Sequence, residues 1–203
     1  FITFCALSEA KGMGINMKIK SMVLIALFAA LTAIGGFIKI PIPYVPFTLQ
    51  IVSVYLAGCL LGPKLGMLSQ LVYVLIGLAG APVFAEGGGP SYIFKPTFGY
   101  LLGFVLGAYV NGWLIKRFQL VKTFSIFLAN FACLLVVYLL GCLWLYATMK
   151  FIFDKSLTIA QTLLFGFVIP IPGDIFLCIL CSIIAAQILP RTNFLIHKQG
   201  VAS

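Results

Sequence analysis

Side chains able to do chemistry are scarce in this chain, and many of them fall in one stretch, Pro82–Gly103, which reads PVFAEGGGPSYIFKPTFGYLLG. Its three consecutive glycines allow backbone N–H groups to approach a ligand closely or to adopt positive φ. Its Phe and Tyr rings offer flat apolar walls, while Glu86 and Lys95 supply charges that face water or each other. The stretch therefore predicts a binding site for a small solute with apolar and polar parts.

Asp174 is the second candidate for chemistry. It follows Ile169-Pro-Ile-Pro-Gly at the start of the last apolar segment, and it is the only carboxylate expected within the depth of a membrane. An acid at that depth is a functional candidate by default. At a helix N-cap the same carboxylate would accept backbone N–H bonds, and the two roles are compatible because each oxygen can serve one. We expect a ligand contact.

Catalysis is not expected. The chain has four acidic residues and one histidine, His197, and it lacks HExxH, GxSxG and phosphate-binding lysine motifs. These absences argue against most membrane metalloenzymes, against aspartyl proteases and against a pump that hydrolyses ATP alone. Cys178-x-x-Cys181 has the spacing of a redox or metal pair, but we favour ordinary helix packing because histidine ligands are lacking. We therefore expect neither enzyme activity nor a metal or cofactor.

The elements that must position these residues are apolar helices. Hydrophobic residues make up 63% of the chain and charged residues 8%, against roughly 25% charged in a soluble domain. Met22–Phe37 and Phe124–Met149 carry no charge, and a membrane-spanning helix needs roughly 20 apolar residues. The sequence predicts an all-α integral membrane protein with six spans: 20–39, 47–62, 65–80, 97–115, 123–148 and 173–190.

The net charge of +9 indicates orientation in the membrane rather than nucleic-acid binding. With six spans, one side holds Glu9 as its acid and most of the basic residues: Lys11, Lys18, Lys20, Lys64, Lys116, Arg117, Lys122, Arg191 and Lys198. The other side mixes both signs: Lys39, Lys95, Lys150, Lys155, Glu86, Asp154 and Asp174. The positive-inside rule then places both termini in the cytoplasm and the glycine-rich stretch outside. If residues 157–170 formed a seventh span, the C-terminal basic residues would lie outside the cell, which argues against this span.

The chain ends are assigned from the same pattern. Met17-Lys-Ile-Lys followed by an apolar run is a natural beginning for a first membrane helix, and no small-residue cleavage site of a signal peptide is evident. We expect residues 1–16 to be a flexible or wrongly assigned extension. Residues 17–191 then form the six-helix membrane domain and 192–203 a cytoplasmic tail.

Two segments beside the glycine-rich stretch have a predicted shape. Prolines at 41, 43 and 46 exclude a helix and favour an extended path that lines or caps a pocket, with Gln50 at its entry into the next helix. Gly62–Gly66 predicts a tight turn between two spans. The small-residue spacings Ala26-x-x-x-Ala30 and Ala29-x-x-x-Ala33 suit contact either with another protein or within the chain. For Gly99, Gly103 and Gly107 we favour helix packing.

Several ordered motifs between residues 17 and 190 resemble one known family. They are Val45-Pro-Phe-Thr-Leu-Gln50, Leu60-Leu-Gly-Pro-Lys-Leu-Gly66, Gly77-Leu-Ala-Gly-Ala-Pro-Val-Phe-Ala85, Lys95-Pro-Thr-Phe-Gly-Tyr-Leu-Leu-Gly-Phe104 and Pro172-Gly-Asp174. Together they resemble the BioY family, the biotin-specific substrate-binding (S) components of energy-coupling factor (ECF) transporters. The resemblance implies the S-component fold, with six membrane helices and the vitamin bound near the outer face.

The resemblance also implies a function and its residues. The expected activity is biotin uptake across the cytoplasmic membrane with a transmembrane coupling protein and ATP-binding subunits; the alternative is an S component or stand-alone carrier for another vitamin. The implied substrate-binding residues are Phe47, Thr48, Gln50, Phe84, Glu86, Gly87, Gly88, Tyr92, Lys95 and Asp174. The implied interface with the coupling protein is Ala26, Ala30 and Ala33.

Biotin suits these residue types. Its ureido group has two N–H donors and one acceptor, which match the Asp174 carboxylate and a donor such as Gln50. Its ring and tail are apolar and suit Phe and Tyr faces, and Lys95 is the candidate for its carboxylate. Two positions depart from the family pattern: Leu177 stands where a lysine is usual, and Phe98 where a small residue is usual. We expect these departures to affect ligand affinity.

Overall fold

The structure is a computed structural model that describes the backbone of residues 2–153 and 158–196 and the side chains of 19–153 and 158–190. The side chains of the expected tail, residues 192–203, fall outside that range. So do several charged side chains on which the predicted orientation in the membrane depends: Glu9, Lys11, Lys18, Asp154, Lys155, Arg191 and Lys198. The backbone of residues 2–16 belongs to the first helix, and their separate status as an extension stays a prediction.

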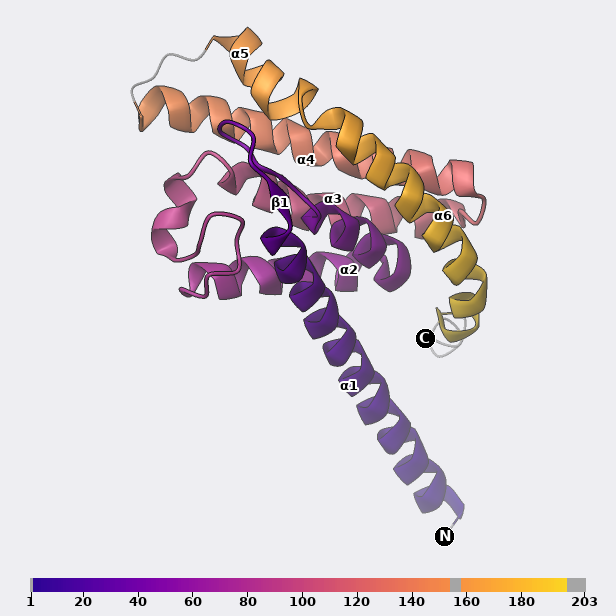
Figure 1. Ribbon diagram of the computed structural model, residues 1–203. Coiled ribbons are helices and arrows are strands. Elements are labelled where there is room, and N and C mark those ends of the chain that lie inside the picture. Colours follow the sequence, from indigo (N-terminus) through magenta and orange to yellow (C-terminus); the bar gives the residue numbers. More distant parts are fainter. Residues whose placement is uncertain (1, 154–157, 197–203) are drawn as a thin grey trace.

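Helices dominate the fold (Figure 1). In chain order the elements are α1 (Ile2–Phe37), β1 (Lys39–Ile40), β2 (Phe47–Thr48), α2 (Gln50–Leu78), a 3₁₀ helix η1 (Pro90–Phe94), α3 (Phe98–Phe118), α4 (Thr123–Phe151), α5 (Ile159–Leu163), a π-helix η2 (Leu164–Val168) and α6 (Ile171–Ile196). Within the described residues, five helical segments are long and apolar enough to cross a membrane: Ile19–Phe37, Gln50–Leu78, Phe98–Phe118, Thr123–Phe151 and Ile159–Pro190. The prediction of a helical membrane protein is confirmed.

Helix α2 folds back on itself. Gly62 has φ 78° and ψ −176°, a left-handed conformation that favours glycine, and it interrupts the helix just before Pro63. A Cβ added at Gly66 would lie 2.9 Å from the carbonyl oxygen of Ala57, and Gln50 near one end of α2 donates a hydrogen bond to Tyr73 near the other. The two arms are therefore antiparallel, and the turn expected at Gly62–Gly66 is confirmed.

The last apolar region differs from the prediction. The piece expected at 157–170 is helical and runs as α5 and η2 almost directly into α6, so that Ile159–Pro190 forms one kinked candidate span. Asp174 lies in the first turn of α6, and its backbone N–H donates to the carbonyl of Pro170 at 3.2 Å. The N-cap placement of Asp174 was therefore wrong. The backbone N–H groups in the first turn of a helix have no acceptor within the helix, so a proline there costs no hydrogen bond. Pro172 is therefore compatible with a helix α6 that begins at Ile171.

Close helix packing holds the bundle together. A Cβ added at Gly103 or Gly107 of α3 would contact Val137 or Cys133 of α4 within 3 Å, which confirms packing as the reason for these glycines. Cys178 and Cys181 of α6 are both fully buried, and the Cys178 thiol lies 3.8 Å from the carbonyl oxygen of Phe127. These close contacts fix the orientation of α3, α4 and α6 about their own axes.

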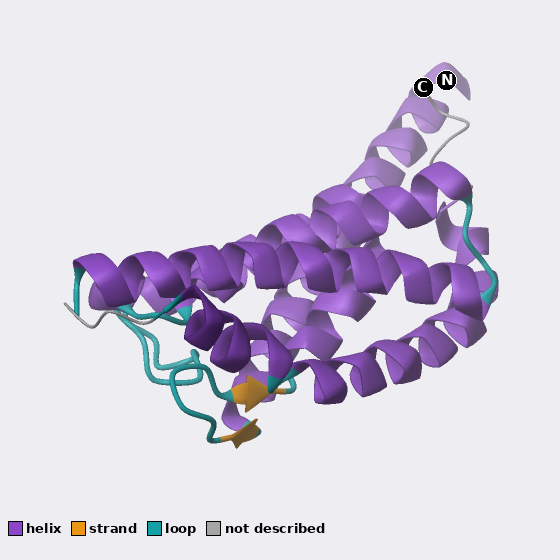
Figure 2. Ribbon diagram, turned by 90° about the horizontal axis from the view of Figure 1, so that it is seen from above, coloured by secondary structure: helices purple, strands orange, loops and turns teal. Residues whose placement is uncertain are grey.

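The two ends of the bundle differ. The β1–β2 hairpin, in which Lys39 pairs with Thr48, lies at the end where the loop between α2 and α3 is found (Figures 1 and 2). The start of α1 and the end of α6 lie toward the other end (Figure 1). Residues 41–46 are not helical, as the prolines at 41, 43 and 46 predict, but the expected extended path was wrong, because the chain reverses there between the antiparallel strands β1 and β2. The hairpin brings residues 45–48 beside the start of α6.

Helix α1 presents two faces. Ala29 is buried, and Thr32 bonds to Gln70 of α2 at 3.2 Å, so this face packs within the chain. Ala26 and Ala30 are exposed, whereas Ala33 is half-buried and packs against the main hydrophobic core. The small-residue stripe therefore divides: Ala33 faces the core, whereas Ala26 and Ala30 face outward.

Candidate functional site

A cavity of about 60 Å³ opens under the β1–β2 hairpin, among residues of α2, α3, α4 and the start of α6. Five of the residues selected from the sequence line it: Phe47, Thr48, Gln50, Tyr92 and Asp174. The remaining lining residues are mostly apolar: Val45, Pro46, Ile51, Ala85, Thr97, Tyr100, Leu101, Phe104, Val137, Tyr138 and Pro170. The lining, apolar with a few convergent polar groups, is of the kind found at sites for small organic solutes. The cavity is smaller than the roughly 300–1,000 Å³ of such sites, so a solute would have to widen it.

The Asp174 carboxylate is the charged group of the cavity. Its Oδ2 accepts a hydrogen bond from the Tyr138 hydroxyl at 2.6 Å, which is the length of a charge-assisted O–H···O⁻ bond. Its Oδ1 has no hydrogen bond within the described part of the chain. Since a carboxylate oxygen carries two lone pairs, Asp174 can accept a further N–H or O–H donor from a solute.

Gln50 is held rigidly beside the hairpin. Its Nε2 donates to the Tyr73 hydroxyl, which in turn donates to the carbonyl of Val83 at 3.2 Å. Its Oε1 accepts from the Thr48 hydroxyl at 3.2 Å. Gly36 leaves the space for this side chain, because a Cβ there would lie 2.8 Å from Nε2. The amide therefore has a fixed orientation at the edge of the cavity, with one N–H and one lone pair to spare.

Other predicted site residues shape the loop between α2 and α3 instead of lining the cavity. Phe84 is buried against Gly77, with its ring 4.5 Å from that of Tyr92. Gly87 has φ 113°, which favours glycine. Gly88 leaves no room for a Cβ, which would overlap the carbonyl of Ala81. These residues support Tyr92, which does line the cavity.

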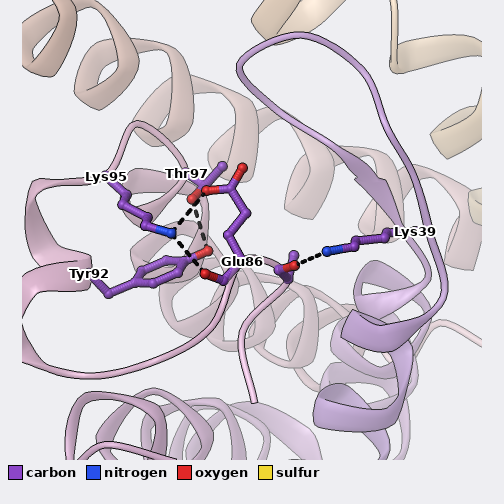
Figure 3. A network of polar contacts seen from close by, with 6 residues as sticks. Lys39, Glu86, Tyr92, Lys95 and Thr97 are labelled. Atoms are coloured by element: carbon purple, nitrogen blue, oxygen red, sulfur yellow. Dashed lines mark hydrogen bonds and ion pairs between the residues drawn. The ribbon is translucent and has the colours of Figure 1, made fainter. Parts of the chain in front are cut away.

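The charged residues of this loop face each other (Figure 3). Lys95 Nζ lies 3.6 Å from the Glu86 carboxylate, donates to the Glu86 carbonyl at 2.8 Å and sits 5.0 Å from the centre of the Tyr92 ring. Both side chains are more than one third exposed. Lys39 Nζ donates to the carbonyl of Ala85 at 2.5 Å (Figure 3). Two lysines thus fasten the loop and the hairpin above the cavity.

Tyr92 is neutral at physiological pH. Burial raises the pKa of its phenol to about 12, and the hydrogen bond with Thr97 at 3.0 Å opposes this shift only in part. A neutral hydroxyl whose ring faces the cavity provides an apolar wall with one polar edge. Tyr92 therefore suits contact with an uncharged part of a solute.

Sequence reasoning missed Tyr100 and Tyr138. Tyr100 lines the cavity and donates to the carbonyl of Gly166 in η2 at 2.7 Å; Tyr138 holds Asp174. Tyr100 was inside a motif already noted, and a hydroxyl in the middle of the apolar run Phe124–Met149 was a signal for Tyr138.

The two departures from the family pattern lie away from the cavity lining. Leu177 is buried in the main hydrophobic core beside Cys178, one turn beyond Asp174. Phe98 is buried with its ring 5.5 Å from that of Trp144, at the contact between α3 and α4. Both residues therefore contribute apolar packing around the site.

Comparison with known proteins agrees with these features. Residues 9–194 match the sequence model of the BioY family. A protein named "Probable biotin transporter BioY" from Lysinibacillus sphaericus is 47% identical over 168 residues, which cover 83% of this chain and 86% of the relative. "Biotin transporter BioY" from Thermotoga maritima is 42% identical over 124 residues, covering 60% and 72%.

A solved structure has a similar fold. The crystal structure of "the S-component for biotin from an ECF-type ABC transporter" superposes with a TM-score of 0.76 at 27% sequence identity. The match covers 86% of this chain and 93% of that chain.

Proposed function

The chain belongs to the BioY family, and from this premise we propose that it binds biotin as the substrate-binding subunit of an ECF-type transporter and serves biotin uptake. The observation that carries the proposal is the coincidence of this family match with a cavity lined by Asp174, Gln50 and aromatic rings. The BioY membership also argues against an enzyme, since the named relatives are transporters.

Biotin would meet complementary chemistry in the cavity. Oδ1 of Asp174 accepts one ureido N–H, and the spare N–H of Gln50 donates to the ureido oxygen. Phe47 and Tyr92 provide the walls for the apolar rings. Thr48 contributes indirectly, because its hydroxyl donates a hydrogen bond of 3.2 Å to Oε1 of Gln50 and so holds the amide in place.

The remaining selected residues act from the loop above the cavity. Phe84, Gly87 and Gly88 give the loop its shape and support Tyr92. The carboxylate of biotin would extend beyond the cavity to Lys95 on the loop above it and compete with Glu86, which lies 3.6 Å from Nζ. Because both side chains are partly exposed, this exchange has a small electrostatic cost.

Equilibrium dialysis of the purified protein in detergent with radiolabelled biotin tests the proposal. We expect saturable binding below micromolar concentration that unlabelled biotin displaces. A panel of other labelled vitamins, such as thiamine and riboflavin, serves as the specificity control. Failure to bind biotin in a protein that remains monodisperse and helical would contradict the proposal.

We also propose that Ala26 and Ala30 form the contact with the coupling protein, with Ala33 supporting it from the core side. Ala26 and Ala30 are exposed on α1, where small side chains let another helix approach closely. Co-expression with ECF coupling and ATP-binding subunits checks this point. Ala30→Trp should abolish co-purification without loss of biotin binding, whereas Leu139→Trp on the exposed face of α4 should leave co-purification intact.

For the topology we propose six crossings of the cytoplasmic membrane, with the two arms of α2 counted separately and both termini in the cytoplasm. The antiparallel arms and the location of the hairpin and loop at one end of the bundle support this count (Figure 1). Thiol labelling of single cysteines in a cysteine-free background tests it. Position 86 should react from outside and position 64 from inside the cell.

The second candidate function is that of an S component or stand-alone carrier for another vitamin. Leu177, where the family usually has a lysine, favours a change of ligand, because a positive charge one turn from Asp174 is replaced by an apolar side chain. Uptake of labelled biotin in cells that lack the coupling and ATP-binding subunits distinguishes stand-alone carriage. The vitamin panel described above distinguishes a different ligand.

A further inference from the structure

Tyr138 is a buried residue of α4 whose ring lines the cavity and whose hydroxyl lies 2.6 Å from Oδ2 of Asp174 on α6. We propose that Tyr138 is a positioning residue: by occupying Oδ2 it fixes the Asp174 carboxylate so that Oδ1 faces the cavity as the acceptor for a ureido N–H. This inference rests on the proposed binding of biotin, and nothing in the comparisons assigns the role.

The Tyr138 ring has its orientation fixed by neighbours other than Asp174. It packs edge-on against Phe167 with ring centres 5.0 Å apart and against Tyr100 at 6.3 Å. Tyr100 is itself immobilised, because its ring covers Gly141 and its hydroxyl donates to the carbonyl of Gly166 at 2.7 Å. The hydroxyl of Tyr138 can therefore be removed as Tyr138→Phe while the ring keeps its packing.

The carboxylate of Asp174 needs such a restraint. It stands in the first turn of α6, where a short acid side chain can instead form local hydrogen bonds with the backbone of its own turn. A bond from Tyr138 to Oδ2 holds the carboxylate across the cavity instead. A ligand that meets a carboxylate already in place loses less affinity to ordering of the site.

A double-mutant cycle with labelled biotin tests the coupling. We expect Tyr138→Phe to weaken binding about five- to tenfold, and to change binding less than about twofold when Asp174→Asn is already present. Tyr100→Phe is the matched control, because it removes a second buried hydroxyl from the same cavity, bonded to a backbone carbonyl. Its effect should be the same factor in both backgrounds.

A measurement without ligand covers the case in which Asp174→Asn binds too weakly for the cycle. The infrared carboxylate band of Asp174, identified by its loss in Asp174→Asn, should shift in Tyr138→Phe and stay in place in Tyr100→Phe. Wild-type affinity in Tyr138→Phe, equal effects in both backgrounds, or an unshifted band would overturn the positioning role while leaving biotin binding intact. Absence of biotin binding by the wild type would overturn the proposed function itself, and this inference with it.

Discussion

The bundle contains two polar regions that use similar side chains in opposite ways. Around the cavity, Asp174 and Gln50 keep hydrogen-bonding capacity that no group of the described chain occupies. Deeper in the bundle Asn111, Asn130 and Ser182 are fully buried and bonded to one another: Asn111 Nδ2 donates to Asn130 Oδ1 at 2.9 Å, and Asn130 Nδ2 donates to Ser182 Oγ at 2.9 Å.

The sealed network connects helices, whereas the polar groups around the cavity keep hydrogen-bonding capacity for a solute. Asn111 also donates to the carbonyl of Tyr55 at 3.1 Å, so the network joins α2, α3, α4 and α6. Hydrogen bonds between membrane helices stabilise their association, typically by about 1 kcal/mol each. Burial alone therefore does not distinguish a structural polar network from a candidate binding site, whereas unoccupied hydrogen-bonding capacity beside a cavity does. Each prediction below has two readouts, biotin affinity and thermal stability in detergent.

The largest effect is expected from Asp174→Asn. Loss of a charge-assisted bond to the ureido group should weaken biotin binding at least tenfold, since such bonds contribute roughly 1.5–3 kcal/mol. Thermal stability should change little, because asparagine has nearly the same shape as aspartate and the side chain borders the cavity. Equilibrium dialysis and a thermal melt check this, and unchanged affinity would mean that Asp174 does not contact the ligand.

Asn130→Leu should lower thermal stability and leave biotin affinity nearly unchanged, the opposite of Asp174→Asn. It removes the centre of the sealed network and leaves Asn111 and Ser182 short of partners, so the free energy of unfolding should fall by about 1–3 kcal/mol. Biotin affinity of the protein that remains folded should stay within about twofold of wild type, because the network lies outside the cavity lining. Leu135→Ala, on an exposed face of the same helix, is the control for a helix substitution.

Thr48→Val should have an intermediate effect on affinity. The substitution keeps the shape of the side chain and removes the hydrogen bond to Gln50 Oε1, so Gln50 becomes less well oriented. A neutral hydrogen bond contributes about 1 kcal/mol, which corresponds to roughly fivefold weaker binding. Stability should be nearly unchanged because Thr48 is half-buried at the hairpin; a drop in stability without loss of affinity would assign Thr48 to the fold instead.

Glu86→Gln should have the smallest effect. The ion pair with Lys95 is partly exposed, and such pairs contribute about 0–1 kcal/mol. We expect at most a twofold change in affinity, with a slight gain if Lys95 becomes free for the biotin carboxylate. Repeating the dialysis at high salt should reduce the difference between variant and wild type. A loss of tenfold or more would make Glu86 a direct ligand contact.

The sequence predicted the helical regions well because hydropathy and helix breakers are local properties. The fold-back at Gly62 and the end of helical structure before the prolines at 41, 43 and 46 follow from the conformations these residues allow. The reversal of the chain between β1 and β2 was missed, because it depends on the pairing of the two strands. The same reasoning misplaced the start of the last helix, since Pro170 and Pro172 are tolerated in a kinked helix when η2 supplies the distortion.

The site was predictable only in part. Phe47, Thr48, Gln50, Tyr92 and Asp174 line the cavity, because sequence motifs and breaks in the helices lie beside it, and their role in substrate binding stays a prediction. Which loop residues face inward was not predictable, since the turn of the loop depends on how Phe84 packs on Gly77. Gly87 and Gly88 therefore shape the loop and do not line the cavity.

By itself the sequence determined that this protein is a membrane-embedded helical bundle, where its helices break and which family it resembles. Each of these follows from residues close together in the chain. Only the tertiary structure decided which polar groups meet: Tyr138 and Asp174 are 36 residues apart, and Asn111 lies 56 residues from Tyr55. Their contacts depend on the orientation and depth of whole helices. The spacing of Gly103 and Gly107 indicates that α3 packs closely, but only the fold shows that α4 is the helix they meet.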